Sequence, residues 1–208
     1  TRAVEDRALA DAIKRSGRVV LAVKTRSGPN DGMQQAPMPF AALAEHARIG
    51  SITARYNFQT AVWRMAYASS AEGGAVPSIA ALLADSKGPA EQTFPIDYSI
   101  DPASIPTISA EALLYGSVSP DLIRGKQVVI GAATDGATDF YYIPGTGKMP
   151  NSYIHILAAE TLKAGHPIHL GWAPLFLAAL ALCALVLSAR TARRQYAALG
   201  AALVGLLS

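Results

Sequence analysis

The sequence predicts an α/β domain followed by membrane-spanning helices, and three observations support this fold class. Helical and strand patterns alternate over residues 1–169, which favours a layered domain with a mainly parallel or mixed sheet. Only 16% of the 208 residues are charged, well below the roughly 25% of soluble domains. Residues 170–189 then form an apolar run without a charge.

The first elements are a helix and a buried strand. Apolar residues recur at helical spacing from Val4 to Ile13, and Gly17 follows as a stop signal. The run from Val19 to Val23 is short, continuous and apolar, which is typical of a strand that is buried on both faces. The stretch from Arg26 to Pro39 is rich in glycine, proline and amides, so it predicts a loop.

The middle of the domain predicts a hairpin and a helix. We expect Ile49–Arg55 and Thr60–Ala68 to pair around a turn at Asn57, because apolar and polar side chains alternate in the second segment with a period of two. The apolar run from Pro77 to Ala84 predicts a helix with proline in its first turn.

Five further elements follow before the apolar run. The sequence predicts a strand over Phe94–Ile100, a helix that begins at Ser109, a turn over Leu122–Gly125, a strand over Gln127–Ala132 and a helix over Asn151–Ala164. The strand over Gln127–Ala132 has the clearest pattern of the chain.

The run from Leu170 to Ala189 has the length of a membrane span. Its 20 residues would form a helix of about 30 Å, the thickness of a hydrocarbon core. Trp172 lies at one end, and Arg190, Arg193 and Arg194 follow the other, so the positive-inside rule places the arginines in the cytoplasm.

These signals predict four segments and a topology. We expect residues 1–169 to lie on the periplasmic face of a bacterial inner membrane, 170–189 to span the bilayer, 190–195 to form a cytoplasmic loop, and 196–208 to begin a second span that is truncated here. Residues 1–169 are formally neutral and lack cysteine, which suits an oxidising compartment. The basic excess is confined to the arginine loop, so nucleic acid is not expected as a partner.

Polar side chains converge after the predicted strand Gln127–Ala132. Asp135 and Asp139 follow its carboxyl end, where α/β domains often bind ligands, and His155 lies in the next helix. We expect a ligand near these three residues. The alternatives are that the aspartates cap turn backbones and that His155 is structural; a hard-metal site with Asp121 or Asp97 is a weaker interpretation.

Catalytic and cofactor motifs are missing from the sequence. It contains no phosphate-binding G-x-x-x-x-G-K-[ST] loop, no dinucleotide-binding G-x-G-x-x-G and no G-x-S-x-G nucleophile elbow. The pair His166 and His169 has no cysteine or carboxylate neighbour, so it is interpreted as an interfacial anchor. We therefore expect no enzyme activity, no cofactor and no metal in this chain.

Six segments carry a family resemblance. In chain order they are DRALADAIKRSGRVVLA, ARIGSITARYNFQTAVWRM, VPSIAALLA, FPIDYS, IPTISAEALLYG and LIRGKQVVIGAATDGATDFYYIPGTGKMPNSYIHILAAETLKAG. Together they resemble the type-two CHASE domain, a sensor family found ahead of cyclases, kinases and cyclic-di-GMP enzymes in bacteria. The resemblance covers nearly all of residues 1–169, with Arg64 at the arginine that follows the family's central turn.

The resemblance implies the input half of a bacterial signal-transduction protein. A periplasmic sensor would pass ligand or stress signals through membrane helices to a cytoplasmic output domain beyond Ser208, either a cyclase, a kinase or a cyclic-di-GMP enzyme. The expected partners are the lipid bilayer, an unidentified small molecule or periplasmic ligand, and a second copy in a homodimer. The alternative is a membrane-anchored interaction or dimerisation module that binds no small ligand.

Overall fold

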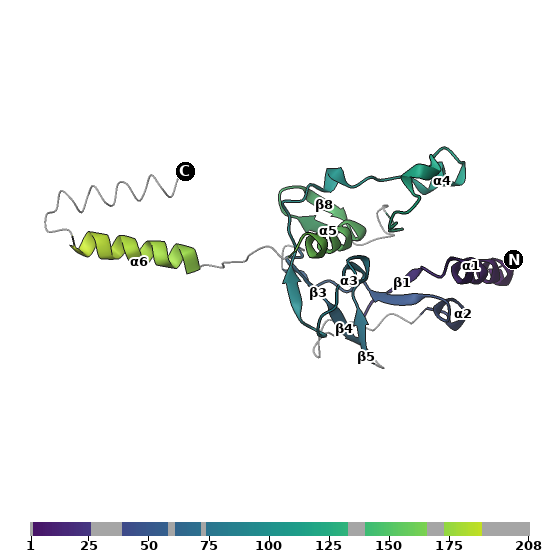
Figure 1. Ribbon diagram of the computed structural model, residues 1–208, viewed down its shortest axis with the longest axis horizontal. Helices are drawn as coiled ribbons and strands as arrows, with labels where there is room; N and C mark the ends of the chain where they lie inside the picture. The colour runs from purple at the N-terminus through teal and green to yellow at the C-terminus, as the bar shows by residue number, and fades with distance from the viewer. Residues whose placement is uncertain are drawn as a thin grey trace. The chain divides into compact units, whose positions relative to one another are not determined.

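The computed structural model describes residues 2–25, 39–57, 61–71, 74–132, 140–165 and 173–188. The chain divides into two compact units, Thr1–Pro167 and Ile168–Ser208 (Figure 1). The first unit contains the strands and all but one of the described helices.

The helix and the strand predicted at the start of the chain are both present, but the strand is not buried on both faces, since Ala22 is exposed and only Val23 is buried. Helix α1 (Arg2–Ser16) ends at Gly17, whose positive φ of 61° suits glycine and whose N–H donates to the Ile13 carbonyl at 3.0 Å. Strand β1 (Val20–Val23) follows it. The loop predicted from Arg26 to Pro39 lies outside the described residues except at its last position.

Strand β1 pairs in parallel with β2 (Arg48–Ser51), in a register that sets Val23 opposite Ser51. The short helix α2 (Ala41–Ala44) precedes β2. Gly50 lies under α3, where a Cβ atom would approach Ile79 Cγ1 to 2.8 Å. The two strands therefore pack closely against the helix that follows.

The hairpin predicted between Ile49–Arg55 and Thr60–Ala68 is wrong, although its turn is present. The Asn57 N–H donates to the Ala61 carbonyl at 3.0 Å, and Asn57 Oδ1 accepts from the Ala61 N–H at 3.0 Å. The chain before the turn pairs with β1 and the chain after it pairs with a later strand. Alternating side chains define the buried face of a strand but not its partner, which is why the pattern misled.

Strand β3 (Arg64–Ala66) pairs antiparallel with β6 (Thr93–Pro95). Met65 and Phe94 lie directly opposite each other and are buried. Arg64 precedes Met65 and is exposed, as a period of two requires. This small sheet therefore has one face in the core and one face turned to solvent.

The predicted strand Phe94–Ile100 is shorter than expected, since β6 ends at Pro95. Asp97 explains the end, because its Oδ1 accepts from the Ser99 N–H at 2.9 Å and from Ser99 Oγ at 2.7 Å. This Asx turn takes the chain out of the extended conformation. The same two hydrogen bonds lower the pKa of Asp97.

The predicted helix over Pro77–Ala84 is present as α3 (Ile79–Leu83). It begins two residues later than expected, because Ser78 is its N-cap and accepts from the Ala81 N–H at 3.1 Å. Pro77 instead ends strand β5 (Gly74–Pro77), which pairs antiparallel with β4 (Ala68–Ala71).

The connection from β6 to β7 contains short helices. They are η1 (Pro102–Ser104), α4 (Ala110–Leu114) and η2 (Pro120–Leu122). Ser109 caps α4 by accepting from the Ala112 N–H at 3.1 Å, which confirms the helix predicted to begin there. A turn follows η2, where one was predicted, and contains Gly125 at a φ of 73°.

The strand predicted over Gln127–Ala132 is wrong. A strand needs a backbone partner, and no described residue forms a ladder with this segment. Ile130 is 94% exposed. Side chains hold the segment instead: Gln127 Nε2 donates to the Leu83 carbonyl at 2.8 Å, and Lys163 Nζ donates to Gln127 Oε1 at 2.9 Å.

A hairpin leads directly into the longest buried helix. Strands β7 (Phe140–Ile143) and β8 (Gly147–Pro150) are antiparallel, and α5 (Asn151–Ala164) follows without a loop. The helix has the predicted bounds. It packs against α3 and β7 and buries an apolar face.

One hydrophobic core joins these elements. Its fully buried apolar members include Val62, Met65, Ala80, Phe94, Ile143, Ile154, Leu157 and Ala158. The α/β class is confirmed, but the described strands form four two-stranded sheets, of which only β1–β2 is parallel, rather than one mainly parallel or mixed sheet. The core therefore depends on helix α5 and side-chain packing more than on a continuous sheet.

The second unit contains helix α6 (Ala173–Ser188), which has 16 residues. Within the described residues, no helix meets both the length and the apolarity needed to cross a membrane.

Candidate functional site

A network of buried hydroxyl groups lies where the parallel strands β1 and β2 end. Thr25 Oγ1 lies 2.8 Å from Ser51 Oγ and 2.9 Å from Thr53 Oγ1, and Ser51 Oγ donates to Ser69 Oγ at 3.3 Å. Thr53 Oγ1 also accepts a hydrogen bond from the Thr25 N–H and donates one to the Thr25 carbonyl, each at 2.8 Å. The network joins β1, β2 and β4 and fixes the position of Thr53 and Ser69.

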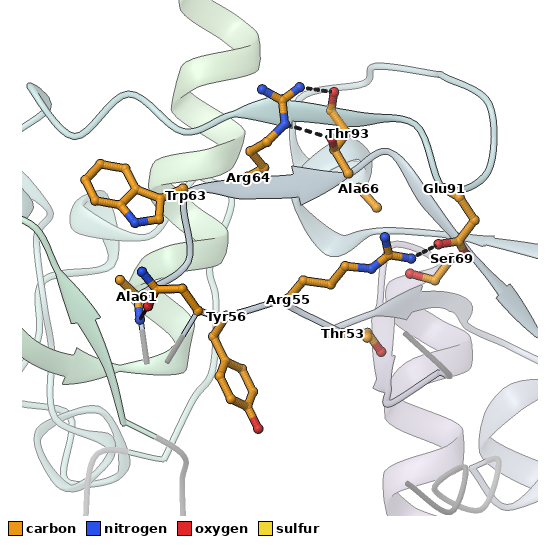
Figure 2. Close-up of a pocket in the computed structure, with 11 residues that line it drawn as sticks. Thr53, Arg55, Tyr56, Ala61, Trp63, Arg64, Ala66, Ser69, Glu91 and Thr93 are labelled. Atoms are coloured by element: carbon orange, nitrogen blue, oxygen red, sulfur yellow. Dashed lines mark hydrogen bonds and ion pairs between the residues drawn. The ribbon is translucent and has the colours of Figure 1, made fainter. Parts of the chain in front are cut away.

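Thr53 and Ser69 form part of the wall of a pocket of about 330 Å³ (Figure 2). The remaining lining residues come from three segments, two of which lie close together in the sequence and one of which lies further along the chain. They are Arg55, Tyr56 and Asn57 after β2; Ala61, Trp63, Arg64 and Ala66 in and before β3; and Glu91 and Thr93 at the start of β6. The volume is at the lower end of small-molecule sites, roughly 300–1,000 Å³.

Glu91 is fully engaged on one side of the pocket. Its Oε2 forms an ion pair with the Arg55 guanidinium, and its Oε1 accepts from the Ser70 N–H at 2.8 Å. Glu91 has a φ of 64°, a left-handed conformation that is uncommon for a residue other than glycine. The two bonds to its side chain stabilise this backbone conformation.

Arg64 is the second cation of the pocket and has a different partner. Its Nε donates to Thr93 Oγ1 at 2.8 Å and one Nη donates to the Thr93 carbonyl at 2.8 Å. Figure 2 shows the two guanidinium groups tied separately, Arg55 to Glu91 and Arg64 to Thr93. Within the described chain, no carboxylate lies within ion-pair distance of Arg64.

Aromatic side chains form the apolar part of the wall. The Trp63 ring is 52% exposed and meets the Tyr98 ring edge to face, with centroids 5.9 Å apart. The Tyr98 hydroxyl donates to the Val62 carbonyl, and burial raises the pKa of Tyr98. Tyr98 therefore holds Trp63 at the pocket, and about half of the Trp63 surface stays exposed.

Of the residues predicted to bind a ligand, only His155 can be located. Asp135 and Asp139 lie outside the described residues, as do His166 and His169. His155 is 2% exposed on α5 and is not part of the pocket wall. A ligand near Asp135, Asp139 and His155 therefore stays a prediction.

The ring of His155 is in an apolar environment. Desolvation lowers its pKa to about 4, and the nearby Ile52 backbone opposes this shift in part. Neither ring nitrogen forms a hydrogen bond of normal geometry with a described residue, and the same holds for Asn151 Oδ1 one helical turn earlier. His155 is therefore neutral at physiological pH.

The two other aspartates that were considered as metal ligands lie apart. Asp97 is occupied by its turn with Ser99, and Asp121 forms an exposed ion pair with Arg124 at 3.6 Å. In the part of the chain that the structure describes, no three potential metal ligands come together.

Sequence reasoning did not identify the pocket. A signal was present, because Arg64 precedes the buried Met65 in the strand and so lies on its solvent face. Its partner Thr93 lies 29 residues later in the sequence and could not be assigned without the pairing of β3 with β6.

Comparison with known proteins identifies the family. The model of the CHASE2 domain matches residues 1–189, most of the chain. No curated protein and no solved structure matched. CHASE2 domains are extracellular sensor domains of membrane proteins, occur in signalling proteins and are sensory rather than catalytic. The chain belongs to the CHASE2 family of sensor domains.

Proposed function

We propose that the chain is the extracytoplasmic input region of a bacterial membrane signalling protein, and that the pocket at Arg64 receives the signal. The observation that carries the proposal is the match to a sensor family over residues 1–189. The uncharged run Leu170–Ala189, followed by three arginines, supports the bilayer as the next environment along the chain. In this proposal residues 1–169 lie outside the inner membrane and 190–195 lie in the cytoplasm.

The contacts of the pocket suggest how occupancy reaches the end of the domain. The Tyr56 ring lies 5.6 Å from the ring of Tyr141 in β7, and Ala61 forms a parallel bridge with Tyr142. Strand β7 packs against α5, which ends at Ala164, shortly before the apolar run begins in the sequence. If these contacts and α5 have two arrangements, a ligand that binds one of them more tightly shifts the equilibrium towards it. The size of the shift is set by the difference between the ligand's affinities for the two arrangements.

Topology is the first test. Alkaline phosphatase, which is active only outside the cytoplasm, is fused after Gly165 and after Arg194, and a cytoplasmic fluorescent reporter is fused at the same two positions. We expect phosphatase activity only from the first fusion and fluorescence only from the second. The opposite result, or the same reporter active at both positions, contradicts the proposed topology.

The coding sequence downstream of Ser208 provides the second test. A cyclase, kinase or cyclic-di-GMP enzyme encoded there supports an input region. A stop codon soon after the membrane spans contradicts it and favours an interaction protein.

An interaction or dimerisation module is the second candidate function, and one observation favours it. Large apolar side chains are exposed along residues 108–130, including Leu114 at 84% and Ile130 at 94%. Exposed apolar surface of this kind often marks an interface, and we infer a second copy of the chain as its partner. Light scattering on the full chain tests this: Leu114→Glu with Ile130→Glu converts a dimer to a monomer, whereas a monomeric parent contradicts it.

A further inference from the structure

We propose that the pocket between Arg64 and Trp63 binds a small monocarboxylate with a planar apolar body, and that Arg64 holds the carboxylate. The proposal deepens the sensor function described above and rests on it, because it names the class of ligand that the sensor would detect. Charge, geometry and the apolar wall each contribute an argument.

The charge of the wall favours an anion with one negative charge. Three lining residues are charged, namely Arg55, Arg64 and Glu91. Glu91 neutralises Arg55, and its second oxygen is taken by the Ser70 N–H. One positive charge, that of Arg64, is left in the wall. A carboxylate balances it, whereas a phosphate near a charge of −2 would leave an unpaired negative charge.

The hydrogen bonds of Arg64 hold its guanidinium ready for such a group. Two of its five N–H groups donate to Thr93, which fixes the plane of the guanidinium. The other three N–H groups have no partner among the described residues. The Thr93 hydroxyl accepts from Arg64 Nε, so its own hydrogen is available to a ligand oxygen. A guanidinium held in a fixed plane can donate two parallel hydrogen bonds to the two oxygens of a carboxylate.

The rest of the wall suits an apolar ring. Trp63 and Tyr56 contribute aromatic side chains to the wall, and Ala61 and Ala66 contribute small apolar ones. Planar rings pack well on aromatic side chains. A pocket of about 330 Å³ admits one ring and a short acid group rather than a larger metabolite.

Calorimetric titration of the full 208-residue chain in detergent micelles tests the proposal, with micelles alone as the blank. Benzoate is the probe, benzamide matches its shape without the charge, and acetate keeps the charge without the ring. We expect benzoate to bind at millimolar or lower concentration and both analogues to bind roughly tenfold or more weakly. Equal affinity for benzamide, tighter binding of phosphate, or no binding of benzoate overturns the proposal.

Variants locate the site. Arg64→Gln should weaken benzoate binding roughly ten- to a hundredfold, since hydrogen bonds to a charged group are lost. Arg64→Lys keeps the positive charge but lacks the planar guanidinium, so its affinity for benzoate should lie between that of the parent and that of Arg64→Gln. Arg124→Gln removes an exposed arginine outside the pocket and should leave affinity unchanged. Unchanged melting temperatures show that the variants fold, and benzoate binding that survives Arg64→Gln overturns the assignment.

The two levels of the proposal can fail separately. Benzoate that binds through Arg64 but never alters the output of the intact membrane protein contradicts the sensor function and leaves the binding site standing. An output that responds to another ligand, unaffected by Arg64→Gln, contradicts the carboxylate assignment alone.

Discussion

The ring of Tyr56 lies 5.6 Å from the ring of Tyr141, at an interplanar angle of 48°. Tyr56 belongs to the pocket wall and is exposed, whereas Tyr141 is part of the core. The pair is therefore a direct side-chain contact between the pocket and strand β7, which packs against α5.

Removing this contact should separate binding from its effect on the helix. In the parent, saturating benzoate is expected to slow hydrogen exchange in α5, because binding to the native state raises the free energy of opening. Tyr141→Leu, which removes the partner ring and leaves the residues of the pocket wall in place, should reduce that protection while benzoate still binds. Exchange followed by mass spectrometry checks this, and equal protection of α5 in both proteins would show that the signal takes another route.

Glu91→Gln should strengthen anion binding. The change releases Arg55 from its ion pair and raises the charge of the pocket wall by one, so the affinity for benzoate should increase severalfold. The free energy of unfolding should fall by about 1 kcal/mol, since an exposed ion pair is weakened. Glu111→Gln, which alters an exposed carboxylate in α4, is the matched control. Calorimetry and chemical denaturation measure both effects, and weaker benzoate binding in Glu91→Gln contradicts the charge argument.

Gly88→Ala should destabilise the first unit. A Cβ atom at this position would lie 2.4 Å from Cγ of the buried Tyr67 ring, so the ring must move. Overpacking of this kind costs about 1–3 kcal/mol. The cost should shrink in a Tyr67→Ala background, where the ring is absent, and urea denaturation of the four proteins gives the coupling directly. Identical costs in both backgrounds would rule out the ring as the cause.

Stability should fall in acid because of His155. Burial lowers the pKa of this residue from its ordinary 6.5 to about 4, so below pH 6.5 the unfolded chain binds a proton that the folded chain does not. The contribution is complete above pH 6.5 and is lost as the pH falls towards 4, by up to about 1.4 kcal/mol per pH unit and roughly 3 kcal/mol in all.

Denaturation curves between pH 7 and pH 4 measure this loss. His155→Leu removes the titrating group and should flatten the pH dependence, while His46→Leu, outside the core, should preserve it. If His155→Leu loses stability in acid as steeply as the parent, the pH dependence comes from other titrating groups.

Local patterns predicted the helices well and the strands less well. Apolar spacing predicted α1 and the exact bounds of α5, since a helix makes its hydrogen bonds within one segment. The strands depend on partners that the pattern does not specify. Arg48–Ser51 pairs in parallel with the earlier strand β1. Gln127–Ala132 has no ladder and is held through the Gln127 side chain, which donates to the Leu83 carbonyl and accepts from Lys163 Nζ.

The pocket was harder to predict for the same reason. Arg64, Arg55 and Glu91 have no shared motif, and they meet only because β3 pairs with β6 in a particular register. The sequence drew attention to Asp135, Asp139 and His155, which follow one strand-like segment, because a loop after an apolar run is a local signal. The long-range pairing of β3 with β6, which local patterns do not specify, therefore decides where the site lies.

The hydroxyl network beneath the pocket has a consequence for the conditions in which a sensor works. Thr25, Ser51, Thr53 and Ser69 are bonded to one another and carry no group that titrates near neutral pH. Their arrangement is therefore indifferent to acidity and to ionic strength, both of which fluctuate outside a cell. Salt would weaken the attraction between Arg64 and an anion while the floor of the pocket keeps its shape, so affinity would vary with the medium and selectivity would not.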